Sequence, residues 1–200
     1  TGAVASQVRA RAPRPRNRQL EALTAETITN LNPLTPLPIL RLFRPAGTLD
    51  ALANCKNLTS VNCYDCNFTG KLDALAKCTL LETLNLSGCN GLDGNYNKVS
   101  EGLTGSFESL SVLVNLRSIN LRDCTNIDRS RAFELLASWD WAAQLESLKI
   151  TGVEGTLDAL ANCTALTDLS LIGCRRLEGQ SYARSGSLFL PCTANRRDHH

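Results

Sequence analysis

Apolar residues recur at fixed spacing along the middle of the chain. Five segments carry them at the first, fourth, sixth and ninth positions, and these segments begin at Leu58, Leu81, Leu116, Leu145 and Leu166. Alternation at the fourth and sixth positions predicts a short strand with one buried face. Leu37, Leu40 and Leu42 form a shortened version upstream. We therefore expect one short strand in each segment, always at the same place.

A second block separates the predicted strands. The pattern Gly-x-Leu-Asp-Ala-Leu-Ala-x-Cys stands at residues 47–55, 70–78 and 155–163, and Gly105 opens a divergent copy. The first two leucine anchors, Leu58 and Leu81, lie 23 residues apart. A unit of this size cannot bury an apolar face alone, so neighbouring units must stack on one another.

Together, the strand motif and the glycine turn resemble the leucine-rich-repeat family over roughly residues 37–179. The pattern is similar to the plant-type subclass, with Cys where that subclass usually has Asn. The resemblance implies an α/β fold, a right-handed solenoid of about five to six rungs. It also implies a parallel β-sheet on the concave face and irregular terminal extensions.

The spacing suggests how the chain is divided. We expect a basic arm at 1–18, an N-terminal cap and degenerate first rung at 19–46, a repeat domain at 47–179 and a tail at 180–200. Within the repeats, the longer interval from Leu81 to Leu116 predicts a polar loop at 94–104. The interval from Leu116 to Leu145 predicts a helical insertion at 129–143, capped by Ser130 or Asp128. The sequence that follows the last repeat, after Leu177, shows no polar cap. Either the tail or a partner must therefore cover that end of the solenoid.

Charge is segregated, although the 200 residues carry a net charge of only +2. Residues 1–18 contain five arginines and no acid, whereas residues 19–179 hold 13 bases and 18 acids. No apolar run approaches the roughly 18 residues of a membrane span, so we expect no transmembrane helix. Two adjacent histidines and the absence of any P-loop, dinucleotide or nucleophile-elbow motif predict a non-enzyme without metal, cofactor or small-molecule substrate.

The nine cysteines include a Cys63-x-x-Cys66 motif that is also found in zinc and redox sites. In the repeat register, however, cysteines share their positions with Leu, Ile, Val and Ala. Only Cys192 lies outside those positions. We therefore expect buried thiols that act as small core residues, with disulfides between rungs as the alternative.

Side chains between the buried strand positions point away from the core and offer a candidate partner-binding face. Its members are Asn62, Tyr64, Asn85, Asn120, Arg122 and Lys149. One interpretation is a hydrophilic sheet face that only keeps the solenoid soluble. The functional interpretation is a face that bonds a partner's polar surface, with Tyr64 and Arg122 as anchors.

The arm is the second candidate contact, through Arg9, Arg11, Arg14, Arg16 and Arg18. It lacks the composition of a core segment, and its prolines exclude a regular helix. Three interpretations stay open: a solvated tail, a contact for an acidic protein, nucleic acid or anionic lipid, and the remnant of a peptide that targets a plastid or mitochondrion. An extracellular location is the alternative to an organelle.

We expect a non-catalytic protein-protein interaction scaffold, an accessory or structural subunit docked among other protein subunits. Peripheral contact with a membrane complex is compatible with this hypothesis. The alternative is a free, receptor-like domain that binds a peptide or glycan on its concave face. Nucleic acid is the least favoured partner, because the body is acidic and poor in aromatic residues.

Overall fold

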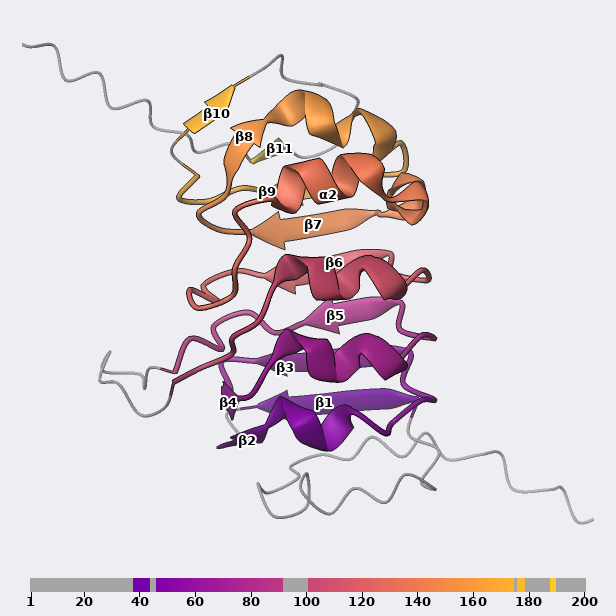
Figure 1. The fold of residues 1–200 in the computed structure, drawn as a ribbon, viewed down its shortest axis with the longest axis vertical. Helices are drawn as coiled ribbons and strands as arrows, with labels where there is room; N and C mark the ends of the chain where they lie inside the picture. The colour runs from indigo at the N-terminus through magenta and orange to yellow at the C-terminus, as the bar shows by residue number, and fades with distance from the viewer. Residues whose placement is uncertain (1–37, 44–45, 92–100, 175, 179–187, 190–200) are drawn as a thin grey trace, which may run out of the picture.

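The computed structural model describes residues 38–43, 46–91, 101–174, 176–178 and 188–189. Its main feature is one parallel sheet whose strands follow one another in chain order. The repeats supply six strands: β1 (Ile39–Phe43), β3 (Ser60–Tyr64), β5 (Thr83–Asn85), β6 (Ser118–Leu121), β7 (Ser147–Ile150) and β9 (Asp168–Ser170). The strands stack along the long axis of the molecule (Figure 1). The predicted right-handed α/β solenoid of about five to six rungs is confirmed, with six repeat strands in the described sheet.

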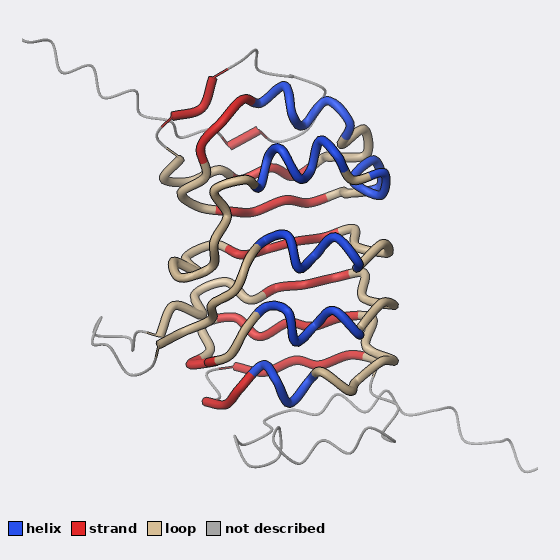
Figure 2. Tube along the Cα trace, viewed as in Figure 1, coloured by secondary structure: helices blue, strands red, loops and turns tan. Residues whose placement is uncertain are grey.

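A layer of short helices crosses one face of this sheet, as the tube view shows (Figure 2). Most are single 3₁₀ segments: η1 (Leu49–Leu52), η2 (Leu72–Lys77), η3 (Phe107–Val112), η4 (Asp140–Gln144) and η5 (Leu157–Asn162). In η1, η3 and η5 the side chain of the preceding Thr48, Ser106 or Thr156 accepts a hydrogen bond from a first-turn N–H. These caps satisfy one of the donors that a helix start leaves unpaired.

Short strand pairs form where the chain leaves the sheet for the helical layer. β2 (Ala46–Thr48) pairs with β4 (Asn67–Thr69), and β8 (Glu154–Thr156) pairs with β10 (Arg176–Glu178). Both pairs are parallel, like the main sheet. The first two rungs and the last two are therefore tied together both in the main sheet and at this second edge.

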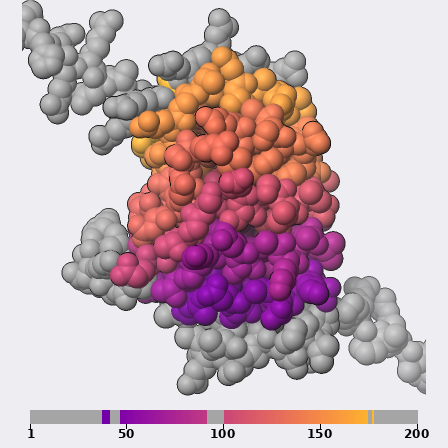
Figure 3. All heavy atoms as spheres, viewed as in Figure 1, coloured from indigo at the N-terminus to yellow at the C-terminus, as the bar shows by residue number. Residues whose placement is uncertain are grey.

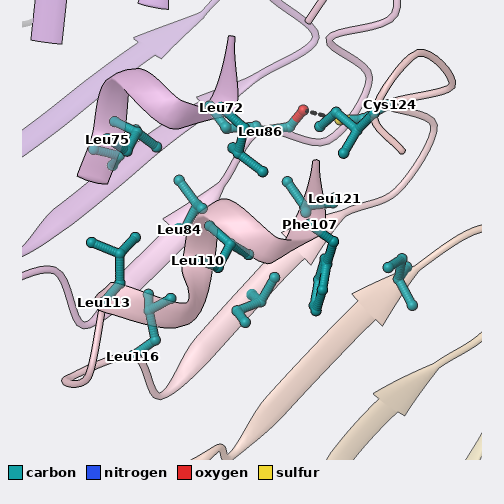
Figure 4. Packing of buried hydrophobic residues seen from close by; sticks show 14 of the residues in the cluster. Leu72, Leu75, Leu84, Leu86, Phe107, Leu110, Leu113, Leu116, Leu121 and Cys124 are labelled. Carbon is teal, nitrogen blue, oxygen red and sulfur yellow. Dashed lines mark hydrogen bonds between the residues drawn. The ribbon is translucent and has the colours of Figure 1, made fainter. Parts of the chain in front are cut away.

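The core lies between the sheet and the helical layer. Every leucine anchor from Leu58 to Leu145 is buried, and the inward strand positions stack in register, such as Leu84 on Ile119. Figure 4 shows leucines of η2 and η3 meeting the strand leucines, with Phe107 at the end of the row. All eight described cysteines are buried, and none of these eight forms a disulfide. The core interpretation of these eight is therefore confirmed, whereas Cys192 lies outside the described residues.

The insertion between β6 and β7 contains the predicted helix, α2 (Ala132–Ser138), followed by η4. The predicted cap is wrong. Arg131 occupies the N-cap position without a side-chain bond, because Asp128 Oδ1 instead accepts hydrogen bonds from the N–H and hydroxyl of Ser130. Trp139 stacks between Phe107 and Trp141, with ring centroids 5.4 Å and 4.9 Å away. The helix thus packs onto the preceding rung through its aromatic end.

Most of the predicted loop at 94–104 lies outside the described residues, but its last residues do not protrude. Leu103 is fully buried, and Thr104 pairs with the chain at Gly70 and Lys71. The arm and the predicted N-terminal cap up to residue 37 also lie outside the described part. In the predicted tail, β11 (Leu188–Phe189) adds a seventh strand beside β9.

The two ends of the solenoid differ in burial. Leu49 and Leu52 of the first rung are fully buried, whereas Leu157 and Leu160, at the same positions of the last helix, are half-buried. The space-filling view shows the helical side as one continuous body between these ends (Figure 3).

Candidate functional site

The sheet face turned away from the helical layer is called the open face here. Its central column consists of side chains in lateral register: Arg41, Asn62, Asn85, Asn120, Lys149 and Ser170. The structure therefore brings four of the six predicted face residues into one line across neighbouring strands. The same register places Ser60, Thr83, Ser118, Ser147 and Asp168 in a parallel column. The open face is rich in hydroxyl and amide groups.

The asparagines of the central column bond within the sheet. Asn85 Nδ2 donates to Asn62 Oδ1 at 3.0 Å. Asn85 Oδ1 accepts from the N–H and hydroxyl of Ser87, at 3.1 and 2.8 Å. Asn120 Oδ1 accepts from the N–H of Arg122 at 3.2 Å. Since each Asn amide offers two donors and two acceptor sites, Asn85 has three of its four positions engaged internally.

Tyr64 and Arg122, the two predicted anchors, follow the inward positions of β3 and β6. Tyr64 is 47% exposed, the only large aromatic among the exposed hydrophobic side chains of the described residues. Arg122 is half-buried, and its Nε is buried without a hydrogen-bond partner. One rung, represented by Ser87, separates Tyr64 from Arg122. The two anchors thus lie on the same side of the asparagine column, two rungs apart.

Lys149 is held by an acid that the sequence places in the neighbouring column. Its Nζ lies 2.7 Å from Asp168 Oδ2, and Ser147 Oγ donates to the same oxygen at 3.1 Å. The hydrogen bond from Lys149 is the main cause that lowers the pKa of Asp168, and the hydrogen bond from Ser147 lowers it further. Partial desolvation of the carboxylate raises this pKa but does not reverse the shift. The ammonium is therefore neutralised within the face and is less available to a partner than the sequence suggests.

Arg41 is a residue that the sequence interpretation missed. It is exposed and pairs in register with Asn62, at the head of the central column. The signal was available, because Arg41 stands between Leu40 and Leu42 as Asn62 stands between Val61 and Cys63.

A second missed group consists of apolar side chains at the edge where strands begin. Leu80, Val112 and Val114 are 49%, 47% and 52% exposed. Leu80 directly precedes the anchor Leu81, and Val112 and Val114 lie four and two residues before the anchor Leu116. Most other copies have polar or small residues at these positions. An alignment of the copies by position would have revealed them.

The helical side contains a groove of about 590 Å³ between α2 and the next rung. Phe133 and Ala137 of α2 and Gly155 and Ala159 of the facing segment provide its apolar surface. Ser130, Glu134, Glu154 and Thr156 complete the lining. The groove exists beside α2, the one α-helix among the 3₁₀ segments of the described helical layer.

The described residues lack two other kinds of site. They contain no group of three or more His, Cys, Asp or Glu side chains that could hold a metal ion. Within the same part of the chain, no helix has the length and apolar character needed to cross a membrane. The arginines of the arm lie outside these residues.

No family model matches the sequence, and no curated protein matches it. Among solved structures, the chain is similar to an internalin C2 from Listeria monocytogenes, with 18% identity over 72% of this chain and 54% of that one, and a TM-score of 0.51. It is also similar to the plant peptide hormone receptor RGFR1 in complex with RGF2, with 19% identity, 70% and 21% coverage, and a TM-score of 0.49. The chain spans about half the length of the internalin and about a fifth of the receptor. The fold of the chain is that of the leucine-rich-repeat proteins, as its repeat motif predicts.

Proposed function

We propose that the chain is a non-catalytic protein-interaction module that serves as an accessory or structural subunit of a multi-protein complex. The observation that carries this proposal is the open face. A parallel sheet presents in-register polar side chains from Arg41 to Lys149, and the described helical layer lies on the opposite face. A polar face that spans several strands suits a folded protein surface better than a small molecule, which is usually bound in an enclosed pocket.

Binding energy on this face should come from its margin rather than from its centre. Asn85 is engaged within the sheet, and Lys149 is paired with Asp168. Tyr64 combines an exposed aromatic ring with a hydroxyl, the combination that is enriched in interface hot spots. Arg41, exposed on β1, lies one strand from Asn62. We therefore assign the anchoring role to Tyr64 and Arg41, with the asparagines holding the strands in register.

The second candidate function is a free recognition domain that binds a peptide or a glycan on the open face. The Asn62–Asn85 amide pair favours it, because an amide donor remains on each of these two side chains and neighbouring strands lie about 4.8 Å apart. An extended peptide that crosses the strands could use such a series.

The test is to isolate complexes with tagged full-length chain from the source organism and to identify them by mass spectrometry. The Tyr64→Ser variant should lose the partner, whereas Leu80→Ser, which removes a comparably exposed apolar side chain at the strand-entry edge, should retain it. Retention by Tyr64→Ser and loss by Leu80→Ser would move the interface to that edge and overturn the open-face proposal.

A further inference from the structure

We propose that the groove beside α2 binds the basic arm of the same chain, residues 9–18. This inference does not depend on what the open face binds. It starts from the insertion itself: α2 replaces the tight 3₁₀ segment of other rungs, and a groove of about 590 Å³ separates it from β8 and η5. Figures 1 and 2 show α2 next to the last helical segment, near the C-terminal end of the solenoid.

The groove combines an apolar surface with acidic walls. Ala137 and Ala159 face it from the two sides, and Gly155 leaves it open. Gly155 has a φ of +126°, and a Cβ there would lie 3.3 Å from the ring of Phe133. Glu134 on α2 and Glu154 on β8 line opposite walls, and no basic residue lines the groove.

The lining of the groove carries two carboxylates and no base, and the bases nearby are held beside it. Asp128, one turn before α2, accepts two hydrogen bonds from Ser130, which lower its pKa and keep it ionised. Arg131 pairs with Glu134 at 3.0 Å, and Arg176 of β10 lies in register beside Glu154. Arg129 turns inward and donates to the carbonyl oxygens of Cys124 and Ile127. An incoming guanidinium group would therefore share Glu134 with Arg131.

The arm has the complementary chemistry. Arg9, Arg11, Arg14, Arg16 and Arg18 alternate with alanine, proline and asparagine. Prolines keep such a segment extended, so that it can lie in a groove between two packed elements at a small entropic cost. Arginine stems can lie along the apolar surface while their guanidinium groups meet Glu134 and Glu154.

The tether is long enough. Nineteen residues, 19–37, connect Arg18 to the first described residue, and an extended chain of that length reaches about 60 Å. From β1 to β9 there are five strand spacings, or about 24 Å. The arm can therefore pass along the whole solenoid and still reach the groove.

Docking is measured by limited trypsin digestion of the full chain. Mass spectrometry monitors the cleavage of the peptide bonds that follow Arg16 and Arg18. We expect both bonds to be protected at low ionic strength. The double variant Glu134→Gln/Glu154→Gln should raise their initial cleavage rates by roughly three- to tenfold, the range expected from losing two exposed charge contacts. The matched control, Glu82→Gln/Glu146→Gln, removes the same charge from the strand-entry edge and should leave these rates unchanged.

Two further variants separate docking from a structural effect. Ala137→Leu fills the groove without changing its charge and should also release the arm. Arg131→Ala removes the competing partner of Glu134 and should slow the cleavage, which loosening of the fold would not do. Equal cleavage rates in the wild type and the groove variants overturn the proposal. Protection that increases with protein concentration also overturns it, because the arm would then come from a second copy.

Discussion

At single positions, the thiols of this core act both as small apolar groups and as weak donors. Cys89 Sγ donates to the carbonyl of Cys63 at 3.0 Å, and Cys124 Sγ donates to that of Leu86 at 2.8 Å. Figure 4 draws the bond from Cys124. Both bonds link consecutive rungs, and both donors stand at the ninth position of their repeats. The sequence correctly predicted that these residues are buried. It did not predict that they bond the backbone, because the position of a cysteine in the repeat indicates burial but not the direction of its S–H group.

Cys63→Ser and Cys89→Ser are predicted to differ in stability. A hydroxyl at position 89 keeps an acceptor, the Cys63 carbonyl, whereas no bond from the Cys63 thiol is found among the described residues. An unpaired buried hydroxyl costs about 1–3 kcal/mol, so Cys63→Ser should lose more unfolding free energy in urea titrations. Equal losses would contradict the assignment of Cys89 as a structural donor.

Alkaline pH should destabilise the fold through its thiols. Desolvation raises the pKa of Cys78 to about 11, with a contribution from Cys55, and desolvation raises the pKa of Cys163 to about 11. Unfolded thiols titrate near 8.5, so between pH 9 and 11 the unfolded state loses protons first. The unfolding free energy should fall there by up to about 1.4 kcal/mol per pH unit per thiol, and stay insensitive to these groups below pH 8.

Urea titrations between pH 7 and 10.5 measure this slope. The variant Cys78→Ala should show a shallower decline than the wild type, whatever its stability at pH 7. Parallel slopes would assign the alkaline loss to other groups.

Two glycines with left-handed backbone should tolerate alanine differently. Gly102 has a φ of +67°, and a Cβ there would lie 2.7 Å from the carbonyl carbon of Asn90. Gly173 has a φ of +70° with no atom within 4 Å of such a Cβ. Both variants incur the left-handed strain, but Gly102→Ala must also displace the backbone, which adds about 1–3 kcal/mol. Thermal unfolding of the pair gives the comparison, and similar midpoints would contradict the close contact at Gly102.

Among the elements, those defined by periodic apolar residues were predictable, and those defined by local hydrogen bonds were not. The strand positions and the helix at 129–143 follow from spacing alone. The start of α2 does not, because Asp128 could cap the helix or bond Ser130, and the two choices look alike in sequence. Likewise, the open-face residues were identified from alternation, but the pairing of Lys149 with Asp168 depends on lateral register.

The uncapped start of α2 gives a prediction at this scale. Replacing Arg131 with Ser supplies an N-cap side chain where none exists, and should raise the thermal midpoint by roughly 2–4 °C. Ser106→Ala is the opposite control, since it removes the cap that bonds Glu108 N–H in η3 and should lower the midpoint. If Arg131→Ser leaves the midpoint unchanged, helix capping does not limit the stability of this rung.

At the scale of the whole molecule, the two ends of the solenoid differ in how well they are buried. Leu49 and Leu52 of the first rung are fully buried, whereas Leu157 and Leu160 at the other end are half-buried. A solenoid is stabilised by contacts between neighbouring rungs, so terminal rungs contribute least and unfold most easily. Alternation could not predict this asymmetry, because residues 47–55 and 155–163 have the same sequence.

Deleting residues 1–18 should separate stability from assembly. The deletion removes no residue of the described core, so the thermal midpoint should stay within about 2 °C of the full chain, as expected for changes outside the packed interior. If the chain is a subunit that also uses its arm, incorporation into the complex should weaken. The open-face comparison should use Tyr64→Ser, because alanine at Asn62, Asn85 and Asn120 would also break bonds inside the sheet. Normal incorporation of the truncated chain, with failure of Tyr64→Ser, would reject the subunit role for the arm and make the open face the binding surface.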